Sequence, residues 1–112
     1  RAEAEAQQAW SSLRRGLADA EAKLLVAWHE ADTLRRQVLP RAEEAYAFAR
    51  DGYRAGKYPF LEVLDAQRTF AETRARFIEV LRDLHIQRAE VERLIGVDRF
   101  NGGAPQPVTP TR

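Results

Sequence analysis

The sequence predicts an all-α protein that folds as a long antiparallel coiled-coil helical hairpin. On both sides of one interruption, at residues 56–59, apolar residues recur in steps of three and four, the spacing of a helix face that packs on a partner helix. Ala, Leu, Arg and Glu dominate and 31% of the residues are charged, a mixture typical of long helices joined along a seam. The core is therefore expected to be a stripe within one hairpin domain, residues 1–96.

The first helix is expected over residues 3–55, with a kink near Pro40. Proline lacks a backbone N–H and its ring clashes with the preceding turn. The apolar spacing nevertheless continues beyond the proline, which favours a kinked helix over a loop. The expected seam residues of this helix are Trp10, Leu13, Leu17, Ala20, Leu24, Trp28, Ala31, Leu34, Val38, Ala42, Ala45, Ala49 and Tyr53.

A short bend at residues 56–59 is expected to reverse the chain. Gly56 can adopt the left-handed conformation that closes the C-terminus of a helix. Tyr58 precedes a proline and is directed toward extended geometry, whereas Pro59 suits the first position of a new helix. The residue types thus specify a tight turn between two helices.

The second helix is expected over residues 59–95 and carries a wide apolar face. Its expected seam residues are Phe60, Val63, Gln67, Phe70, Arg74, Phe77, Leu81, Leu84, Val91 and Ile95, with a neighbouring line of Leu61, Leu64, Ala71, Ala75, Ile78 and Ala89. This width suggests contact with helices on two sides. Gly96 is expected to end the helix, and the Pro, Gly and Thr content of residues 97–112 predicts a flexible C-terminal tail.

Composition excludes several function classes. The formal net charge is +1 and basic residues alternate with acidic ones, so nucleic acid is not an expected partner. The absence of cysteine excludes disulfides and thiolate metal sites. The longest apolar run, at residues 24–28, is far shorter than the ~20 residues of a membrane-spanning helix. The start at Arg1 without a methionine suggests a piece of a longer protein, with any signal peptide or lipid anchor outside it.

Catalysis finds no support in the sequence. It has no Ser/His/Asp or Cys/His set and no glycine-rich phosphate loop after a strand, so no enzyme activity and no cofactor are predicted. His29 and His85 are single histidines on different helices that could lie level in the hairpin, but two imidazoles alone make a weak metal site. Both are interpreted as surface residues or residues at the edge of the seam.

Glu62 and Asp65 differ from the other charged residues because they lie within one turn of each other beside the bend. Acidic side chains in the first turns of a helix compensate the positive end of its dipole. Alternatively, several copies of the chain could gather these carboxylates around an opening, where a ring of acids attracts cations. The sequence pattern leaves both interpretations open.

The bend region resembles the outer membrane efflux protein family, the TolC-like outer membrane factors of Gram-negative bacteria. The resemblance covers roughly residues 10–96. It is carried by Tyr53-x-x-Gly56 and then Val63-Leu-Asp-Ala-Gln-Arg-Thr69, with support from Val38-Leu-Pro-x-Ala-Glu43-x-Ala45 and Glu92-Arg-Leu-Ile-Gly96. The same motifs are similar to the heavy-metal efflux branch of cobalt-zinc-cadmium resistance channels.

The resemblance implies a passive conduit and not an enzyme. It implies that the chain is the C-terminal periplasmic hairpin of a homotrimeric α-barrel, continuous with an outer-membrane β-barrel and joined to a periplasmic adaptor protein and an inner-membrane pump. On this basis the gate residues would be Tyr53, Glu62 and Asp65, and the adaptor-docking tip would comprise Gly56, Lys57, Tyr58, Pro59, Val63 and Leu64. The isolated hairpin is expected to self-associate, because neighbours would cover its apolar face.

Two residues depart from the family pattern. Tyr58 stands where some members carry a basic residue of a closing salt-bridge network, and Pro59 is unusual at the tip. The resemblance therefore does not extend to an ionic lock at that position. Two other interpretations of the hairpin remain open: the coiled-coil hairpin of a periplasmic adaptor, and a cytoplasmic structural coiled coil with no role in transport.

Overall fold

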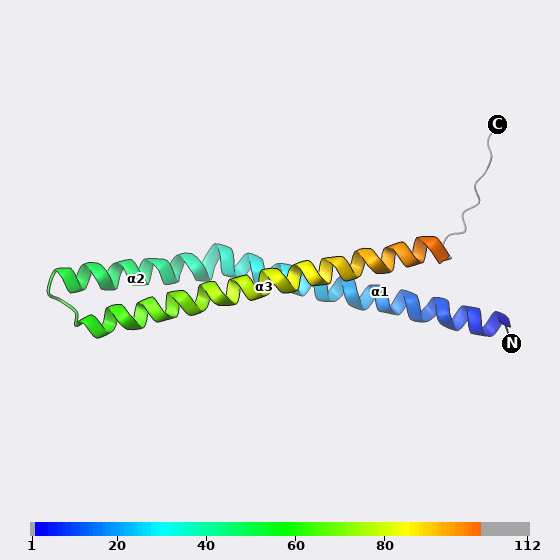
Figure 1. The fold of residues 1–112 in the computed structure, drawn as a ribbon, viewed down its shortest axis with the longest axis horizontal. Helices are drawn as coiled ribbons and strands as arrows, with labels where there is room; N and C mark the ends of the chain where they lie inside the picture. The colour runs from blue at the N-terminus through cyan, green and yellow to red at the C-terminus, as the bar shows by residue number, and fades with distance from the viewer. Residues whose placement is uncertain (1, 102–112) are drawn as a thin grey trace, which may run out of the picture. The chain divides into compact units, whose positions relative to one another are not determined.

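A computed structural model describes residues 2–101 and confirms the all-α hairpin. Its elements are α1 (Ala2–Thr33), the π-helical segment η1 (Leu34–Val38), α2 (Leu39–Arg54) and α3 (Phe60–Asn101). Figure 1 shows α2 and α3 joined by the short bend. Within residues 2–101 every element is helical.

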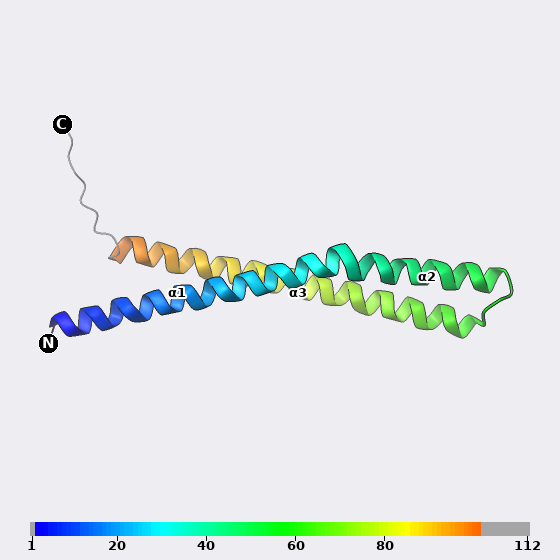
Figure 2. The ribbon, with the colours of Figure 1, turned by 180° about the vertical axis from the view of Figure 1, so that it is seen from behind.

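The described residues form two compact units. One combines residues 2–26 with residues 84–101, and the other is residues 27–83. In the second unit, α2 and the first half of α3 run side by side in opposite directions, as the two opposite views agree (Figures 1 and 2). This unit contains the bend and is the part that matters for the candidate site.

The seam of α3 follows one heptad repeat without interruption. Ten buried or half-buried positions alternate steps of three and four: Val63, Ala66, Phe70, Thr73, Phe77, Val80, Leu84, Gln87, Val91 and Leu94. Leu81, Glu90, Ile95, Val97 and Asp98 are half-buried as well. The seam expected from the sequence coincides with this heptad at Val63, Phe70, Phe77, Leu84 and Val91. At Gln67 and Arg74 it is wrong by one residue, because the smaller Ala66 and Thr73 face the seam instead.

On the opposite helices the buried seam residues are small. Ala20, Ala27, Ala31 and Ala49 are 4 to 8% exposed, and Gly52 is buried beside the bend. Trp28, expected in the seam, is 50% exposed, since Ala27 takes the inward position. Small side chains let the two helix backbones approach closely, and a Trp ring at the same place would separate them.

The irregularity near Pro40 is a π-helical turn that precedes the proline. The N–H of Leu39 donates a hydrogen bond to the carbonyl of Leu34, five residues earlier. Pro40 follows as the second residue of α2 and has no N–H to donate to the preceding turn, which belongs to the same uninterrupted helical stretch. The chain therefore passes from α1 to α2 without a loop.

The predicted end of the second helix is wrong. The helix α3 continues through Gly96 to Asn101, and Gly96 does not have a positive φ. Beyond the glycine, Val97 lines an apolar hollow together with four residues of α1: Ala6, Ala9, Trp10 and Leu13. The predicted tail thus begins too early, and its remainder, residues 102–112, lies outside the described residues.

The bend at the end of α2 is a Schellman turn. Gly56 has φ of 79°, its N–H donates to the carbonyl of Tyr53 (2.9 Å), and the N–H of Lys57 donates to the carbonyl of Gly52 (2.7 Å). The second helix then starts with Glu62 N–H donating to the carbonyl of Pro59 (3.0 Å). The turn thereby satisfies the carbonyls that α2 would otherwise leave without partners.

Replacing Gly56 by alanine is expected to destabilise the hairpin by about 1–2 kcal/mol, because a Cβ disfavours the left-handed conformation. The free energy of unfolding in urea, followed by circular dichroism, measures the effect. The matched control is Gly96→Ala, a glycine within α3 with open space around the position of a Cβ. That control is expected to stabilise the helix by roughly 0.5–1 kcal/mol. An equal response of the two sites would contradict the conformational requirement at Gly56.

Candidate functional site at the hairpin tip

The tip, defined here as residues 48–65, is held by aromatic contacts across the bend. The rings of Tyr53 and Phe60 lie 5.1 Å apart at an interplanar angle of 55°. Those of Phe48 and Tyr58 lie 5.9 Å apart at 38°. Both distances are typical of stabilising aromatic pairs, so α2 is tied to the chain that follows it at two points.

Tyr58 packs directly on the backbone of Gly52. A Cβ at Gly52 would collide with the ring carbons of Tyr58, with Cγ only 3.2 Å away and two other ring atoms closer. The N–H of Tyr58 also donates to the carbonyl of Gly52 (3.3 Å). The glycine is therefore required by close packing, in contrast to Gly56, which is required by its backbone conformation.

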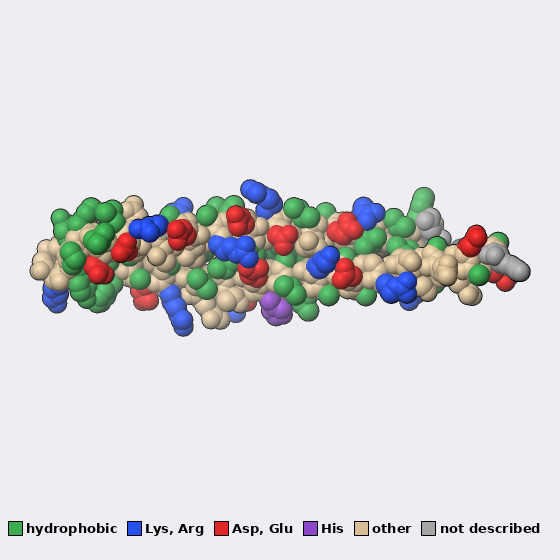
Figure 3. All heavy atoms as spheres, turned by 90° about the horizontal axis from the view of Figure 1, so that it is seen from below, with side chains coloured by type: hydrophobic (Ala, Val, Ile, Leu, Met, Phe, Trp, Pro, Cys, Tyr) green, Lys and Arg blue, Asp and Glu red, His purple; other side chains and the backbone are tan. Residues whose placement is uncertain are grey.

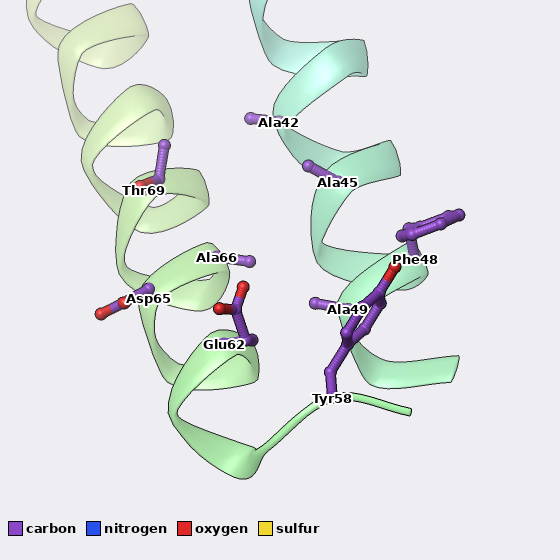
Figure 4. A pocket seen from close by; sticks show the side chains of 9 residues that line it. All are labelled: Ala42, Ala45, Phe48, Ala49, Tyr58, Glu62, Asp65, Ala66 and Thr69. Atoms are coloured by element: carbon purple, nitrogen blue, oxygen red, sulfur yellow. The ribbon is translucent and has the colours of Figure 1, made fainter. Parts of the chain in front are cut away.

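A groove of about 510 Å³ runs between α2 and α3 behind this contact. Its floor is made of small side chains, and two aromatic rings and two carboxylates stand around it (Figure 4). The lining residues are Ala42, Ala45, Phe48, Ala49, Tyr58, Glu62, Asp65, Ala66 and Thr69. An apolar lining with a few charged groups is typical of a binding groove.

The two carboxylates at the groove point in different directions. Glu62 lies on the side of α3 that faces α2 and its carboxylate runs along α3, whereas Asp65 points away from α2 (Figure 4). Asp65 accepts a hydrogen bond from Arg68 Nη2 at 3.2 Å, in an exposed ion pair. Only Glu62 therefore presents its charge over the groove.

The tip residues predicted from sequence differ in their accessibility. Gly56, Lys57, Tyr58 and Pro59 are exposed, Leu64 is 43% exposed and Tyr53 is 46% exposed. Val63 is only 6% exposed and lies in the seam. The Val63 side chain therefore supports the tip from inside and offers little surface.

The sequence reasoning missed two exposed apolar residues at the tip as surface features: Phe48, which is 66% exposed, and Phe60, which is 51% exposed. Leu61, which is 63% exposed, belongs to the line expected to widen the apolar face. Figure 3 shows hydrophobic side chains gathered at the tip end, at the left of that view. The available signal was a phenylalanine, Phe48, outside the predicted seam.

An ion pair braces the hairpin behind the tip. Arg76 of α3 donates to Glu30 of α1 and also contacts Glu79 (3.5 Å). The hydrogen bond and charge of Glu30 raise the pKa of Arg76. The described residues contain no group of three His, Cys, Asp or Glu side chains placed to hold a metal ion. His29 instead lies edge-on against Trp28, with ring centroids 5.3 Å apart.

Comparison with known proteins identifies the family. The family model described as outer membrane efflux protein matches residues 1–97. The chain belongs to the outer membrane efflux protein family. This confirms the resemblance found in the bend motifs. No solved structure matches the chain.

A curated relative indicates the branch of the outer membrane efflux family. The cobalt-zinc-cadmium resistance protein CzcC of Cupriavidus metallidurans is 41% identical over 85 residues, which cover 76% of this chain. The chain spans about a fifth (20%) of the length of that relative. The similarity to the heavy-metal branch is thereby confirmed. In the described part of the chain, no helix combines the length and apolar character needed to cross a membrane.

Replacing Gly52 by alanine is expected to displace Tyr58 and to destabilise the hairpin by about 1–3 kcal/mol, the usual cost of overpacking. Urea unfolding of the single and double variants measures the effect. In a Tyr58→Ala background the same substitution should lose this cost, because the ring that the Cβ meets is absent. An equal loss of stability in both backgrounds would show that the contact with Tyr58 is not the cause.

Proposed function

We propose that this chain is a periplasmic hairpin of an outer-membrane efflux channel, and that the assembled homotrimer is a passive conduit. The observation that carries the proposal is the match of the efflux family model to residues 1–97 on a helical hairpin. Family membership favours the channel over an adaptor hairpin and over a structural coiled coil. The segment then lies in the periplasm of a Gram-negative cell, with a periplasmic adaptor and an inner-membrane pump as partners.

The exposed apolar residues away from the seam support a place in a wall of helices. Leu61, Leu64 and Ile78 of α3 are 43 to 63% exposed, and monomeric soluble proteins rarely expose contiguous apolar surface of this kind. Neighbouring helices of the same protein or of other subunits would cover it. For the same reason the isolated chain self-associates in this proposal.

The tip then serves as the gate and the adaptor-docking site. Tyr53, together with Glu62 and Asp65, narrows the closed end of the tunnel, and the carboxylates of several subunits form rings that attract cations. The docking surface consists of Gly56, Lys57, Tyr58, Pro59 and Leu64, held from inside by Val63. The exposed side chains of Phe48 and Leu61 extend it.

The exported substrates in this proposal are divalent transition-metal cations. The support is the similarity to a protein named for resistance to cobalt, zinc and cadmium. Acidic rings at the tip would suit such cargo, because carboxylates lower the energy of a cation in a narrow opening.

Charging the tip surface is expected to abolish metal resistance. In a strain whose own gene carries Phe48→Asp with Leu61→Asp, growth in zinc, cobalt or cadmium should fall to that of a strain lacking the gene, because two exposed apolar contacts are lost. The control variant is Glu44→Gln, an exposed polar position on α2. Normal resistance without the gene would contradict the transport proposal. Normal resistance of the Asp variant alone would contradict the docking surface.

Neutralising the tip acids is expected to weaken cation selectivity. In planar bilayers, the intact channel with Glu62→Gln and Asp65→Asn should show a cation-to-anion permeability ratio lowered toward one. The single Glu62→Gln change should account for most of the loss, since Asp65 is paired with Arg68. Selectivity unchanged in the double variant would remove the acidic rings from the proposal.

A further inference from the structure

The seam of α2 is displaced by one residue relative to the seam that precedes it. Before η1 the inward positions of the second unit are Ala27, Ala31 and Leu34, and after it they are Leu39, Ala42, Tyr46 and Ala49. All steps are three or four residues except the step from Leu34 to Leu39, which is five. A regular heptad would place the next inward residue at Val38, which is 39% exposed.

The partner helix carries no matching irregularity. Over the same unit, α3 alternates steps of three and four from Val63 to Val80, so one helix of the pair holds an additional residue. A π-turn contains one residue more than an α-turn. The hydrogen bond from Leu39 N–H to the carbonyl of Leu34 closes that wider turn at the five-residue step.

Without the π-turn, a continuous α-helix would present a different face of α2 to α3. One residue corresponds to a rotation of about 100°. The inward positions would become Val38, Arg41, Ala45 and Phe48. A guanidinium would then enter the seam, which is unfavourable without a partner. The Phe48 ring would take the inward position that Ala49 occupies, and its contact with the Tyr58 ring would be lost.

We propose that η1 is a register-setting device that rotates α2 by one residue, so that its alanines face α3 and Phe48 faces outward at the tip groove. The seam side chains on either side of η1 fix this rotation. Pro40 lies within the same helical stretch and lacks the N–H that would bond to the preceding turn, so the wider turn also accommodates the proline, and the proposal assigns the rotation itself to the seam. The inference concerns the hairpin alone and is independent of transport.

Cross-linking of facing positions tests the proposal in the 112-residue chain, whose sequence contains no cysteine. Tyr46 and Phe70 face each other, with ring centroids 6.1 Å apart. The pair Tyr46→Cys with Phe70→Cys is treated with a short bifunctional thiol reagent, and linked peptides are read by mass spectrometry. The matched control pairs combine Phe70→Cys with Ala45→Cys or with Ala47→Cys, one residue to either side of the facing position.

Deletion of Gln37 should leave the link at positions 46 and 70, because the shortened step is then four residues and η1 becomes an ordinary α-turn. The midpoint of thermal unfolding of the Gln37 deletion variant should equal or exceed that of the undeleted chain. A shift of the link to positions 47 and 70 would overturn the proposal, since the π-turn would then persist without regard to register.

Pro40→Ala provides a second test that does not change the chain length. The link should again stay at positions 46 and 70, because the seam residues are unchanged. A shift to positions 45 and 70 would show that the proline, and not the seam, holds the register, and would also overturn the proposal.

Discussion

The narrow seam between the two antiparallel halves of the chain is the constraint on which the other features of the hairpin depend. Val63 and Val80 of α3 are buried at two positions of an unbroken heptad. On the opposing helices, almost every buried residue is an alanine, and Gly52 is buried next to the bend. Because close packing leaves no room for larger side chains there, the register of the two halves is strongly specified. The π-turn at η1 and the compact bend both preserve that register.

Several large apolar residues lie outside this seam. Trp28, Phe48 and Leu61 are each at least half exposed, while the buried residues are alanines and valines. A two-helix hairpin that buries little apolar area has little to offset its conformational entropy. This agrees with the proposal that neighbouring helices cover the hairpin in an assembled channel.

Much of the fold could be predicted from sequence, since helix periodicity and turn chemistry are local. The heptad positions Val63, Phe70 and Phe77 and the left-handed Gly56 were identified correctly. Errors arose where packing decides between neighbours. Trp28 was favoured over Ala27 because hydrophobicity was weighed without the width of the seam.

The end of α3 and the shift at η1 could not be read from sequence for a related reason. Gly96 has the residue type of a helix cap, yet the helix continues beyond it, and Val97 lines a hollow with residues of α1. That hollow joins residues far apart in the sequence. Likewise the ion pair of Glu30 with Arg76 lies between α1 and α3, beyond any local pairing rule. Charge patterns within one helix therefore describe only part of the electrostatics.

The candidate site shows what the motif residues do physically. Leu64 and Asp65, although adjacent to Val63 in the motif, have different surroundings: Val63 fills the seam, Leu64 is partly exposed and Asp65 pairs with Arg68. An exposed pair of this kind contributes little to stability, but it places the Asp65 charge away from the groove. Within the described residues, Glu62 has no ion-pair partner and extends over small side chains next to Tyr58. Within one helical turn, one acid is therefore paired with an arginine of its own helix, whereas the other has no ion-pair partner among the described residues.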